Sequence, residues 1–129
     1  MNINESSEMY LETILVLEKE NTTVHSVDIA RKMHFSKPSV SVKVHALEKE
    51  NYLSINADGS ILLQPKGREI AERIYERHNV IGEILVALGV NPATAYSDAC
   101  KIEHDISEET FSCLKKHIEE HSQHKKTDF

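Results

Sequence analysis

The chain has 129 residues, of which 40% are hydrophobic and 28% are charged, and its formal net charge at pH 7 is −6. This size suits one ordinary domain or two small domains that share a core, and the composition excludes a disordered chain. The acidic balance argues against a uniformly basic nucleic-acid coat, but it leaves room for a local basic patch.

Residues 6–20 are predicted to form a first helix, because Tyr10, Ile14 and Leu17 recur at helical spacing. Ser6 or Ser7 can cap this helix. Met9 and Glu12 are three residues apart, so they share a helix face that is displaced from the apolar stripe.

Two short helices are predicted next, with Ser26 as the cap of one and Ser36 as the cap of the other. Their apolar stripes are Ile29, Ala30 and Met33 in the first, and Val40, Val44 and Leu47 in the second. A tight turn at His34 and Phe35 joins them, and this pattern indicates a helix-turn-helix.

The outward face of the second of these helices carries Val42 among polar residues, which is unusual for a plain surface. Such a face suits a helix laid in a DNA major groove, where apolar groups touch thymine methyls and lysines neutralise phosphates. A solvated face with one stray valine is the alternative. The predicted DNA-binding residues are Ser36, Lys37, Pro38, Ser39, Ser41, Val42 and Lys43.

Two β-prone runs, 53–56 and 61–63, flank the sequence Ala57-Asp58-Gly59-Ser60, and Asp-Gly in this position predicts a β-hairpin. A hairpin directly after a helix-turn-helix makes a winged helix. The two features together predict DNA binding, which neither would predict alone.

A long helix is predicted from Pro65 to about Leu88, with Gly89 at its end. Its expected apolar stripe is Ile70, Ile74, Ile81, Leu85 and Leu88. His78 occupies the slot between Ile74 and Ile81, where it is either a core histidine or a ligand.

Two further helices are predicted, one capped by Asn91 with Pro92 in its first turn and one capped by Ser107. The first carries the heptapeptide 98–104, expected to be helical, in which Cys100, Glu103 and His104 point the same way. Thiol, carboxylate and imidazole are good metal ligands. One helix cannot complete a coordination shell, so further donors are expected elsewhere. The second has Phe111, Leu114 and Ile118 as its apolar face.

Four motifs together resemble the diphtheria toxin repressor family of iron- and manganese-responsive regulators. They are Ser7–Leu11 for the opening helix, Lys37–Ser41 for the recognition helix, Pro65–Gly67 for the helix after the wing, and Ala99–His104 for the metal helix. The resemblance implies a mainly α fold with a winged helix-turn-helix and a small β-hairpin wing in residues 1–70. Residues 71–129 would form an all-α metal-binding and dimerisation domain with a polar C-terminal tail. The SH3-like third domain of larger members has no counterpart, which implies the short two-domain form.

The family's iron-type primary site falls on Met9, Cys100, Glu103 and His104, while Glu12 and His78 match further ligand positions. Manganese-type members carry carboxylates in place of Met9 and Cys100, so these two residues imply Fe(II), whereas Glu12 is a manganese-type feature. Mn(II), Co(II), Ni(II) and Zn(II) are alternative ions. At the iron-type ancillary site, Tyr96 replaces a histidine, and Gly82 stands at the carboxylate position with Glu83 one residue later.

The resemblance implies a metal-dependent repressor of metal homeostasis genes, in which metal binding favours a homodimer on a palindromic double-stranded DNA operator. No enzymatic activity and no small-molecule substrate are expected. The alternatives are a winged-helix DNA-binding protein with a structural metal site, a Mn(II)-responsive regulator, a metallohydrolase with an open coordination position, and a winged-helix regulator without metal.

A cytoplasmic protein that does not enter the membrane is expected, because no apolar run approaches the roughly 18 residues of a membrane span and the start lacks the features of a signal peptide. Cys100 and Cys113 are expected to be reduced thiols, since no small secreted framework surrounds them.

Overall fold

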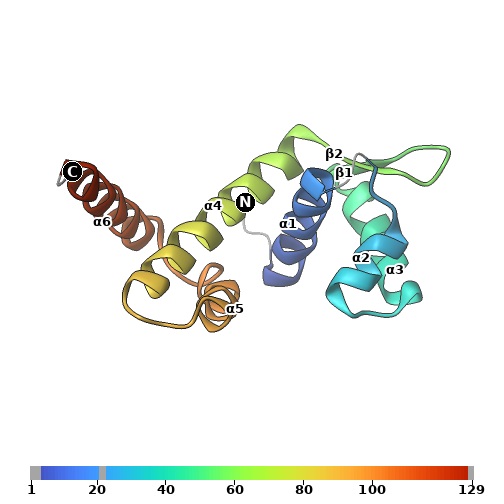
Figure 1. Cartoon of the computed structure of the whole chain (residues 1–129). Coiled ribbons are helices and arrows are strands. Elements are labelled where there is room, and N and C mark those ends of the chain that lie inside the picture. The colour runs from blue at the N-terminus through green and yellow to red at the C-terminus, as the bar shows by residue number, and fades with distance from the viewer. Residues whose placement is uncertain (1–3, 21–22, 128–129) are drawn as a thin grey trace. The chain divides into compact units, whose positions relative to one another are not determined.

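The computed structural model describes residues 4–20 and 23–127, which form six helices and one β-hairpin (Figure 1). In chain order the elements are α1 Glu5–Glu20, α2 Ser26–Met33, α3 Lys37–Lys49, β1 Leu53–Ile55, β2 Ile61–Leu63, α4 Pro65–Ala87, α5 Pro92–Ile102 and α6 Glu108–Thr127. Among the described residues, no helix combines the length and the apolar character needed to cross a membrane.

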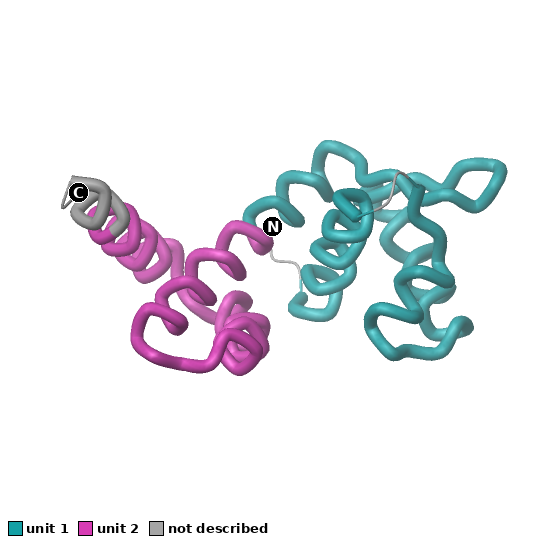
Figure 2. Tube along the Cα trace, viewed as in Figure 1, with its two compact units in different colours: residues 1–73 teal, residues 74–129 magenta. Residues whose placement is uncertain are grey.

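The chain divides into two compact units, Met1–Arg73 and Ile74–Phe129, shown in teal and magenta in Figure 2. The boundary between these units falls inside α4. The division after Ile70 that the sequence suggests stays a prediction.

In the first unit, α1 packs against α2 and β2, while α3 packs against α2 and β1. The predicted stripes supply the core: Tyr10, Ile14, Leu17, Ile29, Ala30, Val40, Val44 and Leu47 are all buried, and Met33 is half-buried. The helix-turn-helix expected from these stripes is therefore confirmed.

The helix starts of this unit follow local hydrogen bonds. Ser36 is the N-cap of α3 as predicted, because its Oγ accepts a hydrogen bond of 3.3 Å from the backbone N–H of Ser39. The prediction of Ser26 as a cap is wrong, since His25 is the N-cap of α2. The Asp28 carboxylate accepts a 2.9 Å hydrogen bond from the His25 N–H. A carboxylate three residues into the helix satisfies the cap's backbone, so the cap itself need not carry a hydroxyl.

The wing is an antiparallel pair in which Leu53 faces Leu63 and Ile55 faces Ile61. Asn56, expected at the end of the first strand, lies outside β1. Asp58 Oδ1 accepts hydrogen bonds from Ser60 N at 2.9 Å and from Ser60 Oγ at 2.6 Å, which fixes the tip. The predicted hairpin is confirmed, and its loop projects away from the neighbouring helices in Figure 1.

The glycine in the first turn of α4 has a steric reason. A Cβ on Gly67 would come 2.0 Å from the backbone oxygen of Tyr52, so only glycine lets the helix start this close to the preceding segment. The N–H of Gln64 donates to the same Tyr52 oxygen at 3.0 Å.

In the second unit the buried apolar residues are Ile74, Ile81, Ala95, Ala99 and Phe111. The stripe predicted to reach Leu88 is wrong at its end, because α4 stops at Ala87 and Leu88 is 76% exposed. Two predicted caps are confirmed: Asn91 Oδ1 accepts from Ala93 N at 3.0 Å, and Ser107 Oγ accepts from Thr110 N at 3.1 Å.

Candidate metal centre

Three donor side chains meet in the second unit, and they come from two helices. His78 lies on α4, Cys100 lies in the last turn of α5, and Glu103 is the residue that caps the C-terminus of α5. The buried residues of α5 are the small Ala95 and Ala99, and Cys100 follows Ala99 directly in the sequence. The predicted helical heptapeptide is therefore corrected at its end, because α5 stops at Ile102.

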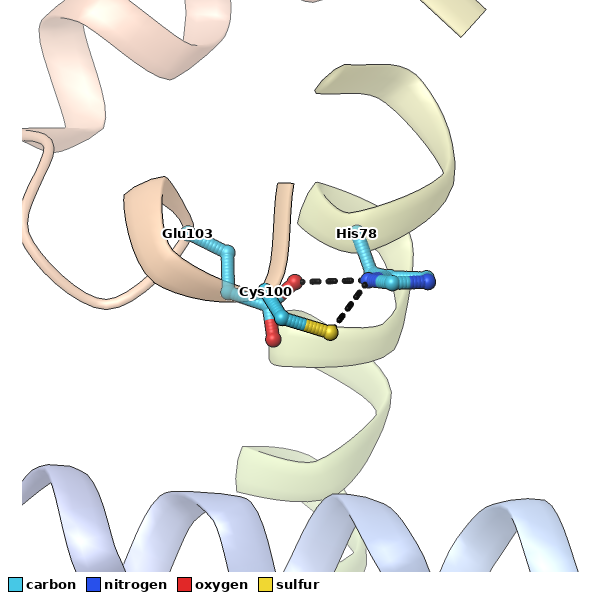
Figure 3. A group of neighbouring side chains, drawn as sticks. All are labelled: His78, Cys100 and Glu103. Carbon is cyan, nitrogen blue, oxygen red and sulfur yellow. Dashed lines mark hydrogen bonds and ion pairs between the residues drawn. The ribbon is translucent and has the colours of Figure 1, made fainter. Parts of the chain in front are cut away.

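One ring nitrogen connects the three donors. Nδ1 of His78 lies 3.0 Å from Glu103 Oε2 and 3.5 Å from Cys100 Sγ. Figure 3 shows both contacts meeting at this nitrogen. One ligand atom from each of the three residues lies within 4.8 Å of the others, which is close enough for one ion to contact all three.

The environment of His78 favours its charged form. The hydrogen bond to Cys100 is the largest cause, the hydrogen bond to Glu103 is the next, and together they raise the pKa of His78 to about 10 even though burial opposes this change. At neutral pH the imidazole therefore carries a proton where a metal would bind. A metal bound through that nitrogen must displace the proton, so its affinity rises with pH.

Glu103 is fully buried, and burying a carboxylate is costly unless partners compensate its charge. Oε2 receives the contact from His78, and Oε1 lies 3.4 Å from His104 Nε2. Oε1 takes no hydrogen bond within the described residues. A buried carboxylate oxygen with spare acceptor capacity, surrounded by imidazole and thiol, fits a cation site.

The donor set also fits a particular class of ion. An imidazole nitrogen, a cysteine sulfur and a carboxylate oxygen suit Fe(II), Co(II), Ni(II) or Zn(II) better than Mn(II), which prefers an all-oxygen or oxygen-rich shell. His78, Cys100 and Glu103 would hold the ion from the second unit, where it would supply positive charge next to the buried carboxylate.

The predicted DNA-binding residues lie at the start of α3 and along its outer face. Ser36, Lys37, Pro38, Ser39 and Val42 are exposed, and Ser41 and Lys43 are half-buried. Val42 is 73% exposed, so an apolar side chain is presented to solvent between polar neighbours. Ser36 Oγ also donates a 2.8 Å hydrogen bond to Ser39 Oγ. Contact of these residues with DNA stays a prediction.

Comparisons with known proteins match both halves of the chain to one family. Residues 2–61 match the N-terminal DNA binding domain of the iron dependent repressor, and residues 64–128 match its metal binding and dimerisation domain. The HTH-type transcriptional regulator MntR of Geobacillus thermodenitrificans (strain NG80-2) is 34% identical over 102 residues, which cover 79% of this chain and 72% of MntR. The chain belongs to the iron-dependent repressor family.

Other members of the iron-dependent repressor family are similar over part of their length. The diphtheria toxin repressor of Corynebacterium diphtheriae is 31% identical over 106 residues, which cover 81% of this chain and 47% of that protein. The structure of the manganese regulator SloR matches with a TM-score of 0.77 and 28% identity, over 92% of this chain and 55% of SloR. The chain thus spans about half the length of these two relatives.

Membership of this family confirms the resemblance found in the motifs and the mainly α fold with a winged helix followed by a helical domain. Family members are transcriptional repressors that bind DNA and metal, and they are not enzymes. The family's two domains support DNA binding and formation of a homodimer.

Gly82 and Tyr96, which the sequence resemblance places at the iron-type ancillary positions, pack against each other. A Cβ on Gly82 would come 2.2 Å from Tyr96 Cε1, so the Tyr96 ring lies directly on the backbone of α4. The same ring lies 5.4 Å from the His78 ring, measured between centroids. Glu83 is exposed on α4. The Tyr96 ring of α5 thus packs directly against Gly82 of α4.

The remaining predicted ligands are His104 in the second unit and Met9 and Glu12 in the first. His104 follows Glu103 directly, and its side chain is 2% exposed. Met9 and Glu12 lie on α1 in the first unit, where Met9 is 37% exposed and Glu12 is half-buried. The roles of Met9, Glu12 and His104 in this family member stay predictions.

Sequence reasoning missed Arg77, the residue before His78. Arg77 is only 5% exposed, and its guanidinium donates hydrogen bonds to backbone oxygens of Glu103 and Ile106. A signal was present in the sequence, since Arg77 lies three residues after Ile74 and four before Ile81, on the apolar stripe of α4.

Proposed function

We propose that this member of the iron-dependent repressor family is an Fe(II)-responsive repressor of metal homeostasis genes. The observation that carries the proposal is the position of Cys100 Sγ, 3.5 Å from His78 Nδ1 in a cluster that includes the buried Glu103. A cysteine ligand in this position favours Fe(II) over Mn(II), because manganese prefers harder oxygen donors.

The proposed ligand set is His78, Cys100, Glu103 and His104 from the second unit, with Met9 and Glu12 from α1. The α1 ligands rest on the sequence resemblance. Metal binding would then affect the DNA-binding unit directly, because an ion with ligands on α1 links that helix to the metal-binding domain.

The proposed mechanism is a shift between states. The ion stabilises the dimeric state that binds operator, and operator DNA has a higher affinity for that state than for the metal-free one. Coupling of this kind is reciprocal, so metal tightens operator binding by the same factor as operator tightens metal binding. Allosteric coupling typically changes an affinity by about 5- to 150-fold.

The proposed DNA-reading element is α3. Val42 would contact thymine methyls in the major groove, hydroxyls of Ser39 and Ser41 would reach base edges or phosphates, and Lys37 and Lys43 would neutralise phosphates. A symmetric dimer with one such helix per subunit fits a palindromic operator whose half-sites are about 34 Å apart, one helical turn of DNA.

The first experiment measures operator affinity as a function of metal. An operator is selected from random-sequence duplex DNA with metal-loaded protein, and binding is then followed by fluorescence anisotropy under anaerobic conditions. We expect a chelator to weaken binding at least about fivefold, and we expect saturating Fe(II) to restore operator affinity more fully than saturating Mn(II). Unchanged affinity in chelator would contradict the proposal that the protein is a metal-dependent regulator.

A second candidate is a Mn(II)-responsive regulator, which is favoured by Glu12 at a manganese-type position and by the similarity to the manganese regulator SloR. Operator affinity at saturating metal separates the two candidates, because most sites bind Fe(II) more tightly than Mn(II) whichever ion is physiological. A Mn(II)-responsive protein reaches its full operator affinity with Mn(II) and a weaker one with Fe(II). A purely structural ion would instead leave the metal-free protein unfolded, which circular dichroism detects.

A further inference from the structure

The buried arginine on α4 has no place in the ligand set, yet it lies beside it in sequence and in space. Arg77 is 5% exposed and immediately precedes His78. A guanidinium is always charged, and burying it is costly unless its donors find acceptors. A charged side chain on the apolar stripe of α4 therefore needs acceptors nearby.

Among the described residues, the partners of Arg77 lie between the end of α5 and the first turn of α6. Nη1 donates to the backbone oxygen of Glu103 at 3.1 Å and to that of Ile106 at 2.8 Å. Nη2 forms an ion pair with the Glu108 carboxylate, and the guanidinium lies 5.2 Å from the centre of the Phe111 ring. One side chain thus fixes the whole segment 103–108.

This segment needs an external anchor, because α5 ends at Ile102 and α6 begins only at Glu108. The last carbonyls of a helix have no partner within it, and the Glu103 oxygen is one of these. Arg77 supplies a charged donor to that oxygen. A hydrogen bond with a charged donor is shorter and stronger than one between neutral groups.

Consecutive residues of α4 therefore hold the two ends of Glu103. Arg77 binds its backbone oxygen at 3.1 Å, and His78 contacts its carboxylate at 3.0 Å. We infer that Arg77 is a positioning residue of the metal centre, which holds Glu103 and the adjoining His104 where they can bind the ion. This inference rests on the proposed function, in which the cluster binds metal.

The chain offers a matched control for a role in helix packing alone. Lys115 on α6 forms a 2.8 Å ion pair with Glu76 on α4, so it also ties α6 to α4. The side chains of Lys115 and Glu76 are 41% and 46% exposed, and neither residue belongs to segment 103–108. Loss of this pair removes an α4–α6 tie without touching the backbone of Glu103.

The test uses the full chain, with Co(II) as a spectroscopic probe. Arg77→Met keeps much of the side-chain volume and removes every donor. We expect its Co(II) affinity to fall at least roughly tenfold, as is usual when a residue that orients a metal ligand is lost. The Co(II) d–d bands should change as Glu103 is displaced. The sulfur-to-cobalt charge-transfer band should persist, because Cys100 lies within α5. Arg77→Lys should recover part of the affinity, and Lys115→Met should match the wild type in both bands and affinity.

Folding is checked by circular dichroism, and Glu108→Gln is measured in parallel in case Arg77→Met does not fold. Glu108→Gln removes the charge partner of Arg77 at an exposed position, and we expect a smaller loss of affinity with the same change in the d–d bands. Wild-type affinity and bands in folded Arg77→Met, or in Glu108→Gln if Arg77→Met is unfolded, would overturn the inference alone. A wild-type protein that binds no Co(II) would overturn the proposed function and the inference with it.

Discussion

At His78 a single ring nitrogen contacts both a thiol and a carboxylate, and this arrangement sets the chemistry of the centre. Hydrogen bonding of the His78 ring to Cys100, and then to Glu103, raises the pKa of His78 to about 10, above its ordinary value of 6.5. In the metal-free protein at neutral pH, the His78 imidazole is therefore protonated. Metal and proton compete for the same nitrogen, and the competition weakens as pH rises.

This raised pKa predicts how the stability of the metal-free protein depends on pH. The pKa of His78 is higher in the folded state than in the unfolded chain, so its contribution to stability is fully present below pH 6.5 and is lost as pH rises through about 10. Because the imidazole is one-fifth exposed, solvent screening reduces the size of this contribution. We expect the difference in melting temperature between wild type and His78→Gln, measured in chelator, to shrink steadily over that range.

The control for this prediction is His117→Gln, since His117 is exposed on α6. It should keep the wild-type dependence on pH. A difference between wild type and His78→Gln that stays constant from pH 6.5 to pH 10 would mean that the pKa of His78 is not raised in the folded state.

At the scale of helices, the packing of α5 on α4 depends on Gly82. The ring of Tyr96 sits where a side chain at position 82 would be, with Tyr96 Cε1 2.2 Å and Cδ1 2.4 Å from a Cβ placed there. Tyr96 lies one helical turn before Cys100, and Gly82 lies one turn after His78. The contact between glycine and tyrosine therefore sets the spacing of the two helices next to the His78–Cys100 pair.

We expect Gly82→Ala to destabilise the metal-free protein, because overpacking costs about 1–3 kcal/mol and the gain in helix propensity offsets only about 1 kcal/mol of this. In a Tyr96→Leu background the same substitution should become neutral or stabilising, since the ring that it meets is gone. Urea denaturation measures both effects. The neighbouring, exposed Glu83→Ala is the matched control and should change stability little. Equal effects of Gly82→Ala in both backgrounds would show that Tyr96 is not the obstacle.

At the scale of the whole molecule, local patterns explain why most elements could be predicted. The stripe of Val40, Val44 and Leu47, the serine cap at Ser36 and the Asp-Gly turn of the wing each act over a few neighbouring residues, and the structure confirms them. His78 could be suspected because a histidine interrupts an apolar stripe ahead of a helix rich in ligands.

Long-range packing decided the features that sequence reasoning missed. The end of α5 at Ile102 coincides with carbonyls that Arg77 holds from another helix, and no local pattern of α5 reveals this. The close contact of Gly82 with Tyr96 likewise joins residues from two elements. The cap at His25 is a local exception: the Asp28 carboxylate, three residues ahead, accepts a hydrogen bond from the His25 N–H, so the helix begins without a hydroxyl at its cap.

In the proposed function, an ion held by His78, Cys100 and Glu103 is coupled to DNA binding. The most direct test measures the affinity of the full chain for Co(II), from its absorption bands, with and without the selected operator duplex. We expect operator to tighten Co(II) binding by the same factor by which Co(II) tightens operator binding, in the range of about 5- to 150-fold, and a scrambled duplex to have a smaller effect. Equal Co(II) affinity in the presence and absence of operator would show that the metal centre is not coupled to DNA binding.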